Sequence, residues 1–484
     1  MADEMSLHNW IGGRRQAPLG GRYLDDIEPA TGQVIAQIPD SGPEDIEQAV
    51  AAAGAAFPAW SCLSVADRAD RLDTLAELIG RDADRLAELE SRDTGKPLKL
   101  AREIDMGRAR ANLKFFSRAM QQWASPGHDM GSTGFNYTRR EPLGVVALIT
   151  PWNLPLYLLT WKLAPALVTG NTVVAKPSEL TPLTADALCS LAVEAGIPAG
   201  VFNLVHGSGP GCGQALVDHP DIKAISFTGG TLTGRKIAAS AAPRLLKTSL
   251  ELGGKNPAVV FADADIDKTV AGLLRAGFTN QGQVCLCSSR WLIHQDIYPA
   301  LVEKLRQAVK RLRVADPNQA DTEQGAVISA DHQSKVLGFI EQARSDGGKV
   351  LCGGRSVQPD GRCQRGYFIE PTLIADLPAD SRLHFDEIFG PVVTLQRFAD
   401  ENEAIALANS VDYGLAATVW TEDLGTAHRV AGRIQAGIIW VNDWLVRDLR
   451  TPFGGMKDSG LGREGGNWSL EFFTEPKNVF IGTS

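Results

Sequence analysis

Residues 145–149 read Val-Val-Ala-Leu-Ile and are the first of several short apolar runs in the middle of this 484-residue chain. The others lie at residues 172–175, 201–205, 224–227 and 258–261. Most of the segments between them are long enough to form a helix. Short buried strands that alternate with helices form a parallel sheet with crossover connections, so these runs predict an α/β fold.

The chain on both sides of these runs is also patterned. Upstream, residues 44–60 and 64–122 are rich in Ala, Leu and Glu at helical spacing, and Ser64 is a suitable N-cap for the second stretch. A chain of this length holds two or three domains. A second alternating block predicts a further α/β domain, with helices near 296–313 and 329–347 and strands near 392–396 and 415–420.

Residues 123–141 break the alternating pattern. They are rich in Gly, Ser and Thr and run into Phe135-Asn-Tyr-Thr-Arg-Arg140, which suggests a hairpin arm. Residues 470–481 also read as extended. Two peripheral strands of this kind can pair into one protruding element, and an exposed strand edge usually finds a partner. We therefore expect a homo-oligomer, and the sequence leaves dimer and tetramer open.

Bulk composition excludes several classes of protein. The net charge of -9 provides no basic surface for nucleic acid. No apolar run is long enough for a bilayer, and residues 1–11 lack the pattern of a signal peptide. The seven Cys residues include no CxxC pair, which favours free thiols in the cytoplasm. Cys285-Leu-Cys287 has no second ligand pair, so we expect no metal site.

A thiol and a carboxylate carry the strongest chemical signal. Cys285 ends the segment Phe278-Thr-Asn-Gln-Gly-Gln-Val-Cys285, and Glu251 lies in Leu250-Glu-Leu-Gly-Gly-Lys255. Taken alone, a Cys is more often a small buried hydrophobe, and a Glu before Gly-Gly is more often an exposed turn. Together, a thiol and a carboxylate are sufficient for covalent catalysis followed by hydrolysis. The surrounding segments decide between these interpretations.

Polar and glycine-rich segments follow the predicted strands, where open α/β sheets bind ligands. Gly229 and Gly234 flank the expected start of a helix and suit a phosphate at its N-terminus. Residues 207–213 look like a dinucleotide fingerprint but lack its third Gly, so a flexible turn is the better interpretation. The segments that follow strands are Thr150-Pro-Trp-Asn153, Lys176-Pro-Ser-Glu179 and Phe227-Thr-Gly-Gly230.

Six of these motifs occur in one fixed order: PWN, KPSE, FTG, LELGGK, NQGQVC and Glu387-Ile-Phe-Gly-Pro391. In this respect the chain, from about residue 10 to its end, resembles the NAD(P)-dependent aldehyde dehydrogenase superfamily. The resemblance implies an α/β protein with a Rossmann-type cofactor domain, an α/β catalytic domain and a β oligomerisation arm. We assign residues 1–122 and 142–250 to the NAD-binding domain, 251–450 to the catalytic domain, and 123–141 and 470–484 to the arm.

The resemblance assigns three catalytic residues. Cys285 is the expected nucleophile, which adds to the aldehyde carbon and gives a thiohemiacetal and then a thioester. The Asn153 amide and the Cys285 backbone N–H would stabilise the developing oxyanion. Glu251 is the expected general base for the water that releases the acid. A base at this position also speaks against the branch of the family that transfers the acyl group to coenzyme A.

The resemblance also implies NAD as the cofactor. Lys176 and Glu179 would hold the adenosine ribose, and Glu387 the nicotinamide ribose. Glu179 should favour NAD over NADP because it repels a 2′-phosphate, although Lys176 reduces that preference. Many family members have Ser where this chain has Gly230, so phosphate binding there would rest on backbone N–H groups. The full predicted cofactor set is Trp152, Lys176, Glu179, Gly229, Gly230, Gly234, Glu387 and Phe389.

The segments around 155–161, 280–290, 444–456 and 464–474 resemble the family branch that acts on 2-aminomuconate and 2-hydroxymuconate semialdehydes. These substrates are conjugated six-carbon chains with an aldehyde at one end and a carboxylate at the other. A cationic anchor for the carboxylate is expected on physical grounds. The resemblance places Arg108 and Arg447 in this role, and Tyr157 and Trp161 as flat walls.

Other functions remain open at this stage. A neutral or cationic aldehyde, such as an aromatic or betaine-type aldehyde, is the alternative substrate within the family. A thiol hydrolase is the alternative of another class, because a reactive Cys can cleave activated esters without a cofactor. Intact Cys285, Glu251 and Asn153 argue against a non-catalytic relative. The sequence does not choose between the amino- and hydroxymuconate semialdehydes.

Overall fold

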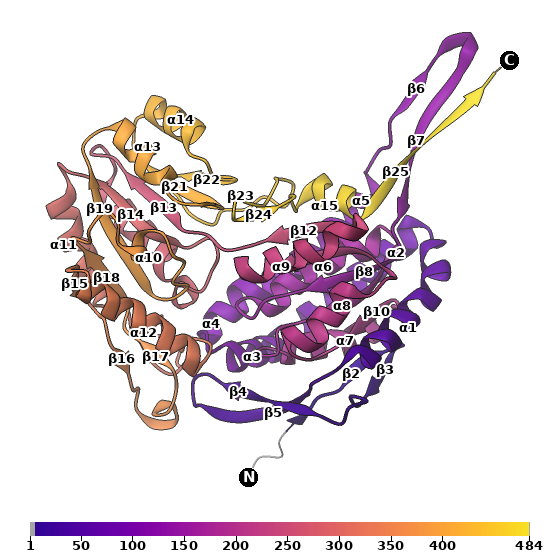
Figure 1. The fold of residues 1–484 in the computed structure, drawn as a ribbon, viewed down its shortest axis with the longest axis horizontal. Coiled ribbons are helices and arrows are strands. Elements are labelled where there is room, and N and C mark those ends of the chain that lie inside the picture. The colour runs from indigo at the N-terminus through magenta and orange to yellow at the C-terminus, as the bar shows by residue number, and fades with distance from the viewer. Residues whose placement is uncertain (1–4, 484) are drawn as a thin grey trace.

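The computed structural model describes residues 5–483 and shows two α/β bodies, from one of which a β arm projects (Figure 1). The first body is built on an eight-stranded sheet of order β24-β12-β11-β8-β9-β10-β2-β3. Its strands β8 to β12 are parallel where they pair, and β2 and β24 are antiparallel additions at the two ends. The bounds are β2 (Asn9–Ile11), β3 (Arg14–Gln16), β8 (Val145–Ile149), β9 (Thr172–Lys176), β10 (Phe202–Leu204), β11 (Ile222–Thr228), β12 (Lys247–Glu251) and β24 (Gly460–Leu461).

Helices cover both faces of this sheet, as the continuous apolar strands require. On β8, Val146 and Leu148 belong to one core, which includes residues of four helices on one face of the sheet, among others. Val145, Ala147 and Ile149 belong to a second core, which includes residues of three helices. The first four helices are α2 (Val65–Arg81), α5 (Gly107–Gln121), α6 (Pro155–Val168) and α7 (Leu183–Glu194). The other three are α1 (Pro43–Ser61), α8 (Gln214–Asp218) and α9 (Thr231–Ala241).

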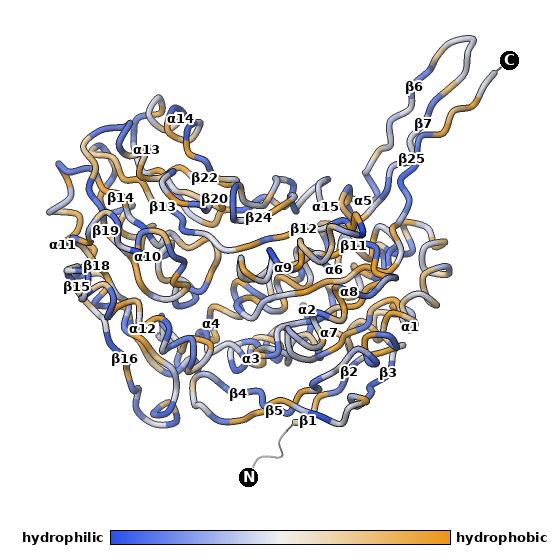
Figure 2. Tube along the Cα trace, viewed as in Figure 1, coloured by the Kyte–Doolittle hydropathy of each residue, from blue (hydrophilic) through white to orange (hydrophobic). Residues whose placement is uncertain are grey.

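The second body holds a seven-stranded sheet of order β15-β18-β19-β14-β13-β21-β22, parallel except at β15. The strands are β13 (Asn256–Val260), β14 (Ser288–His294), β15 (Lys349–Cys352), β18 (Thr372–Ala375), β19 (Val392–Phe398), β21 (Ala416–Trp420) and β22 (Ile438–Val441). The helices are α10 (Ile266–Phe278), α11 (Tyr298–Val309), α12 (Ala330–Ser345), α13 (Glu401–Asn409) and α14 (Leu424–Arg433). Figure 2 shows hydrophobic residues along the central strands of both bodies.

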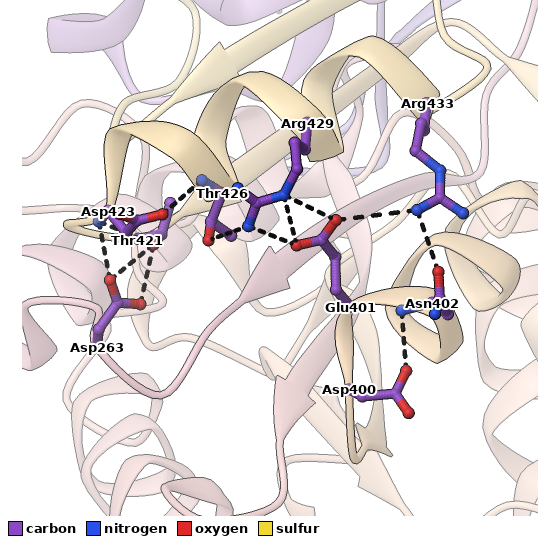
Figure 3. A network of polar contacts seen from close by, with 9 residues as sticks. All are labelled: Asp263, Asp400, Glu401, Asn402, Thr421, Asp423, Thr426, Arg429 and Arg433. Carbon is purple, nitrogen blue, oxygen red and sulfur yellow. Dashed lines mark hydrogen bonds and ion pairs between the residues drawn. The ribbon is translucent and has the colours of Figure 1, made fainter.

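A polar network fixes the outer helices α13 and α14 to this sheet (Figure 3). The Asp263 carboxylate accepts hydrogen bonds from the Thr421 hydroxyl at 2.8 and 2.9 Å and from the Asp423 N–H at 2.9 Å. The Arg429 guanidinium on α14 forms an ion pair with the Glu401 carboxylate on α13, with 2.9 Å between Nη2 and Oε2. Exposed ion pairs of this kind each contribute little to the free energy of unfolding. The network links the two helices to each other and to the sheet without adding much stability.

Several short elements complete the bodies. Strands β1 (Met5–Ser6), β4 (Tyr23–Glu28) and β5 (Gln33–Pro39) form a small sheet. Two-stranded sheets pair β16 (Ser356–Val357) with β17 (Phe368–Ile369) and β20 (Tyr413–Gly414) with β23 (Met456–Lys457). In the part of the chain that the structure describes, no helix is long and apolar enough to cross a membrane.

The predicted arm is present, with one correction. Strands β6 (Gly127–Asp129), β7 (Gly134–Pro142) and β25 (Thr474–Gly482) form an antiparallel sheet in which β25 pairs with β7 along its length. The expectation that residues 470–481 are extended was wrong at its start, because α15 (Gly466–Phe472) includes residues 470–472. Leu470 is fully buried in the core of the first body, and a helical turn holds it there.

The helical stretch 64–122 is also more broken than its composition suggests. Ser64 caps α2, accepting from the Asp67 N–H at 3.1 Å as predicted. The stretch then divides into α2, α3 (Ala83–Thr94), α4 (Leu98–Leu100), a π-helical segment Ala101–Met106 and α5. Gly95 ends α3 with a φ of 75°, a left-handed conformation that glycine adopts without strain.

Candidate active site

The ends of neighbouring strands bring the predicted site residues together. Strands β12, β11, β8 and β9 are adjacent and parallel, so their carboxyl ends share one edge of the first sheet. Glu251 closes β12 and Asn256 opens β13, so the chain crosses here from the first sheet to the second. The site therefore lies between the carboxyl edge of one sheet and the amino edge of the other.

Three adjoining cavities run along this edge. The outer cavity, about 440 Å³, is lined by Lys176, Glu179, Gly229 and Gly230 among others. The middle cavity, about 260 Å³, shares Trp152, Gly229 and Gly230 with the outer cavity. The inner cavity, about 40 Å³, shares Leu158 and Cys285 with the middle one. Cys285 therefore stands where the middle and inner cavities meet.

In the outer cavity, the Lys176 ammonium donates to the Glu179 carboxylate at 2.9 Å. Burial alone would raise the pKa of Glu179, but the Lys176 charge and hydrogen bonds from backbone N–H groups, including that of Gly209, hold it below its ordinary value. An ionised carboxylate beside a cation can accept from two neighbouring hydroxyl groups. Gly209, Pro210 and Gly213 also line this cavity, so the segment 207–213 belongs to the site, although its sequence indicated only a turn.

The glycines at the start of α9 have different roles. Gly230 is the N-cap at φ -70°, and a Cβ there would meet no atom within 4 Å, so neither backbone nor space requires glycine. A Cβ at Gly234 would lie 2.4 Å from Leu252 Cδ2, so Gly234 allows α9 to pack closely on the segment after β12. Of the three predicted glycines, Gly229 and Gly230 line the cavity and Gly234 does not.

In the middle cavity, Glu387 accepts from the Gly254 N–H at 2.9 Å, and burial raises the pKa of its carboxyl. The Trp152 and Phe389 rings meet edge to face at 5.3 Å between centroids. His332 and Lys335 from α12 also line this cavity. The sequence did not predict these two residues as part of the site, because their helix carries no recognisable motif and only the fold brings it to the cavity.

The segment before Cys285 is held in an uncommon conformation. Asn280 and Gln281 have φ of 53° and 56°, left-handed values that cost energy for residues other than glycine. The Asn280 amide donates to the Asn153 carbonyl at 3.0 Å, and the Asn153 amide donates to the Gln283 carbonyl at 2.9 Å. These bonds connect the Asn153 segment to the Cys285 loop. One Asn153 N–H makes no hydrogen bond within residues 5–483 and can donate to a ligand.

Burial raises the pKa of the Cys285 thiol, and the nearby carboxylates of Glu251 and Glu387 add to the effect. The thiol is therefore neutral at rest and needs a base to become a nucleophile. The Cys285 carbonyl accepts from the Asn256 amide at 2.7 Å, which fixes the loop. Cys287 is buried nearby, with its Sγ 3.8 Å from the Thr279 carbonyl oxygen.

Glu251 is buried, and neither of its carboxyl oxygens has a hydrogen-bond partner within residues 5–483. Burial first, and then the charge of Glu464, raise the pKa of Glu251 well above its ordinary value, while Lys162 acts in the opposite direction. Lys162 in turn bonds Glu464 at 2.6 Å and the Ser226 hydroxyl at 2.9 Å. A carboxyl group with a raised pKa and with oxygens free of hydrogen bonds can take up a proton. The buried Lys162–Glu464 ion pair acts on the charge of this carboxyl group.

Glu251 does not line either of the cavities that Cys285 lines, whereas its neighbours Leu252 and Gly253 line the middle one. The Lys162–Glu464 pair was also missed from the sequence. Lys162 lies on the apolar helix α6 and Glu464 lies 302 residues later, so no local pattern joins them.

The inner cavity joins Cys285 to aromatic and cationic side chains. The Arg447 guanidinium lies 4.9 Å from the centre of the Trp161 ring and 4.2 Å from that of Phe453. It donates to the Tyr157 hydroxyl at 3.1 Å. Arg108 lies 5.8 Å from the centre of the Tyr157 ring and is not among the residues that line the cavity. The lining residues are Leu100, Ile104, Asp105, Leu154, Tyr157, Leu158, Trp161, Thr279, Asn280, Val284, Cys285, Leu286, Leu445, Arg447 and Phe453.

Within residues 5–483, no group of three or more His, Cys, Asp and Glu side chains is arranged to hold a metal ion. All seven cysteines are free thiols. The chemistry available at this site is therefore that of a thiol, two buried carboxyl groups and an amide, beside cavities that can take a cofactor and a small substrate.

Comparison with known proteins agrees with this arrangement. A model of the aldehyde dehydrogenase family matches residues 17–479, and the chain belongs to that family. It is 48% identical over 479 residues to a 2-aminomuconic semialdehyde dehydrogenase of Danio rerio, covering 98% of each chain. It is 44% identical over 481 residues to a 2-hydroxymuconic semialdehyde dehydrogenase of a Pseudomonas species, covering 98% of this chain and 99% of that one.

A solved structure supports the fold. The NAD+ complex of an aldehyde dehydrogenase from Bacillus cereus superposes with a TM-score of 0.96 at 37% identity, covering 99% of this chain and 97% of that one. The predicted family and α/β fold are thus confirmed, and the protein is an oxidoreductase that oxidises aldehydes.

Proposed function

We propose that this enzyme uses NAD to oxidise a carboxylated semialdehyde to the dicarboxylate, with 2-aminomuconate 6-semialdehyde and 2-hydroxymuconate semialdehyde as the candidate substrates, in the catabolism of tryptophan or other aromatic compounds. The observation that carries the proposal is the cation Arg447 in the same inner cavity as the Cys285 thiol. The named activities of the relatives support the same class of substrate.

Arg447 has the features of an anion receptor. Its Nη2 is buried and makes no hydrogen bond to the residues that the structure describes. A buried donor without a partner is unfavourable, and a carboxylate would satisfy it with a charge-assisted bond. The rings of Trp161 and Phe453 hold the guanidinium in place and give the cavity flat apolar walls for a conjugated chain. Arg108 would add a second positive charge behind Tyr157.

The outer and middle cavities fit NAD. The Lys176–Glu179 pair would hold the adenosine ribose, the start of α9 at Gly229 and Gly230 would face the phosphates, and Glu387 would hold the nicotinamide ribose. Trp152 and Phe389 line the middle cavity beside it, and Gly234 allows the close packing of α9. When bound, NAD supplies the acceptor for the hydride that leaves the substrate.

Cys285, Glu251 and Asn153 would perform the first chemical step. The Cys285 thiol loses its proton to Glu251, and the thiolate adds to the aldehyde carbon to form a thiohemiacetal. The free Asn153 N–H and the Cys285 backbone N–H donate to the oxygen that becomes negative. Loss of hydride from the thiohemiacetal carbon leaves a thioester on Cys285.

Glu251 would also perform the second step. It first releases the proton taken from Cys285 to solvent and then accepts a proton from water. The resulting hydroxide attacks the thioester carbon and releases the acid and the Cys285 thiolate, which regains a proton from Glu251. The raised pKa of Glu251 suits a group that takes up and returns protons. In the buried Lys162–Glu464 pair, Lys162 favours the ionised form of Glu251 and Glu464 opposes it.

An assay with both muconate semialdehydes tests the proposed substrate. NADH formation and loss of the conjugated substrate band would be followed together, with a neutral unsaturated aldehyde of the same length as the control. We expect kcat/KM to be at least about tenfold higher for the carboxylated substrates, the effect of one charge-assisted hydrogen bond. Equal values for charged and neutral aldehydes would contradict the proposed substrate class. Equal catalytic efficiency with NAD and NADP would count against the role of Glu179.

We also propose that the enzyme is a homodimer or homotetramer in the cytoplasm. Phe480 and Ile481 on the edge strand β25 are 49% and 52% exposed, and Val441 on the edge strand β22 is 40% exposed. Two apolar edges on one chain can pair between copies. Sedimentation would measure the assembly, and a monomer at micromolar concentration would contradict it. Free thiols suit a reducing compartment.

The same proposal covers the domains. Residues 1–122 and 142–250 form the NAD-binding domain, in which residues of the second segment line the outer cavity, and residues 251–450 form the catalytic domain. Residues 123–141 and the part of 470–484 that follows α15 form the oligomerisation arm, to which β6, β7 and β25 belong.

A further inference from the structure

The Tyr157 hydroxyl lies beside the Arg447 guanidinium in the inner cavity. Tyr157 lies in the first turns of α6, is buried, and lines the cavity with Cys285 and Arg447. Its hydroxyl oxygen accepts from Arg447 Nη1 at 3.1 Å. Its side chain is therefore more than an apolar wall, because a polar atom is fixed beside the guanidinium.

The direction of this bond leaves the hydroxyl proton available. Arginine has N–H donors and no acceptor, so in the Arg447–Tyr157 bond the phenol oxygen must accept. Within residues 5–483 the Tyr157 hydroxyl donates to no protein acceptor. Asp105 also lines the cavity, but Lys96 donates to one of its carboxyl oxygens at 2.8 Å and the other has no hydrogen-bond partner within residues 5–483, so no bond joins it to Tyr157.

Arg447 presents a second free donor at the same place, because its Nη2 has no partner. A carboxylate has two oxygens and accepts from two donors at once. The free Tyr157 O–H and the free Arg447 Nη2–H therefore form a two-donor receptor for one carboxylate. Arg108, 5.8 Å from the centre of the Tyr157 ring, makes this end of the cavity more positive.

From this geometry we infer that the Tyr157 hydroxyl donates directly to the remote carboxylate of the substrate and sets the preference for carboxylated over neutral aldehydes. The inference rests on the proposed function, because it requires a substrate with a remote carboxylate. Arg447 supplies the charge, and Tyr157 supplies the second hydrogen bond and fixes the angle between the two donors.

The test is Tyr157→Phe, which removes the hydroxyl and keeps the ring. We expect kcat/KM for a muconate semialdehyde to fall about ten- to a hundredfold, mainly through KM, as for loss of a hydrogen bond to a charged group. The value for a neutral aldehyde of the same length should change less than about threefold. Tyr298→Phe is the matched control, because Tyr298 is also buried against an arginine, with Arg397 at 4.3 Å from its ring, and does not line the cavity.

A second variant separates direct donation from an effect through Arg447. In an Arg447→Gln background, Tyr157→Phe should cost a further fivefold or more, on the order of one hydrogen bond, if the hydroxyl itself contacts the carboxylate. No further loss would mean that Tyr157 acts only by holding Arg447, and would overturn the inference. Equal losses on charged and neutral aldehydes would also overturn it.

The wild-type enzyme distinguishes this failure from failure of the proposed function. If it does not discriminate between charged and neutral aldehydes, the proposed substrate class is wrong. If it discriminates and Tyr157→Phe discriminates equally well, the substrate class stands and the role of Tyr157 is wrong. Competitive inhibition by muconate gives an independent readout, because binding of the dicarboxylate should weaken in Tyr157→Phe by a similar factor.

Discussion

The two ends of the joined cavities are built in different ways. The outer end consists of short segments at the carboxyl ends of neighbouring parallel strands, with residues such as Lys176 and Glu179 only three positions apart. The inner end consists of side chains from distant elements, and Arg447 and Tyr157 are 290 residues apart. The outer end uses backbone and general features of the fold, whereas the inner end depends on individual side chains. If the proposed function is correct, cofactor binding depends on general features of the fold, and the choice of substrate depends on a few side chains.

The largest expected effect lies at the junction of the two ends. Cys285→Ala should reduce aldehyde oxidation by at least about a thousandfold, because no other nucleophile can form the thioester. NAD binding, measured by calorimetry, should remain, since Cys285 lines only the middle of the two proposed NAD cavities and the outer one is unchanged. Cys287→Ala is the control and should keep most of the activity. Near-normal turnover in Cys285→Ala would contradict the covalent mechanism.

We expect the second-largest effect from Glu251→Ala, which should reduce turnover about a hundred- to ten-thousandfold because general base catalysis is lost. Deacylation should slow more than hydride transfer, so mass spectrometry after one turnover should find an acyl group on Cys285. An unmodified enzyme with slow hydride transfer would instead assign Glu251 mainly to activation of the thiol.

The pH dependence gives a related check on Glu251. Because its pKa is raised, the carboxyl is protonated over a wider pH range than an ordinary Glu, and only the ionised form is a base. Deacylation in the wild-type enzyme should therefore accelerate as pH rises through that raised pKa. The acceleration should disappear in Glu251→Ala, and an unchanged profile would assign the titration to another group.

At the inner end, Arg108→Ala should reduce kcat/KM for a muconate semialdehyde by about tenfold, since one positive charge near the carboxylate is lost. The effect should be smaller than that of Arg447, because Arg108 does not line the cavity. Arg110→Ala is the matched control on the same helix, where Arg110 pairs with Glu77 at the surface at 3.0 Å. Equal losses in both variants would show that this helix matters only for structure.

The smallest expected effect is a gain at the outer end. Gly230→Ser should lower the KM for NAD about two- to fivefold, because a hydroxyl at the N-cap can donate to a phosphate and the site has room for it. Gly432→Ser is the control, since a Cβ at Gly432 also meets no atom within 4 Å and lies on the remote helix α14. A higher KM for NAD in Gly230→Ser would show that the glycine itself aids cofactor binding.

The sequence predicted the outer end better than the inner end for a physical reason. Strand runs and the segments that follow them are local patterns, so β8, β9 and β11 and the positions of Lys176 and Gly229 could be read directly. His332, Lys162 and Glu464 carry no local pattern, because tertiary packing alone brings them to the site. Residues 64–122 have a uniform helix-forming composition, although a glycine turn and a π-helical segment interrupt the helix. Composition alone therefore did not predict these breaks.

Residue type alone does not show where each predicted residue lies. Gly234 was expected at the cofactor, and in the structure it packs closely against Leu252 and does not line the outer cavity. Arg108 and Arg447 looked equivalent in sequence, but only Arg447 lines the cavity with Cys285. Tyr157 was expected as an apolar wall, and its hydroxyl bond to Arg447 could not be foreseen from the sequence.

The most direct test of the account is the selectivity of Arg447→Ala. The measurement is the ratio of kcat/KM for a muconate semialdehyde to that for a neutral unsaturated aldehyde of equal length, in the wild type, in Arg447→Ala and in the exposed control Arg450→Ala. We predict that the ratio falls about ten- to a hundredfold in Arg447→Ala, the cost of one charge-assisted bond, and is unchanged in the control. An unchanged ratio in Arg447→Ala would contradict the claim that the inner cavity selects its substrate by a remote carboxylate.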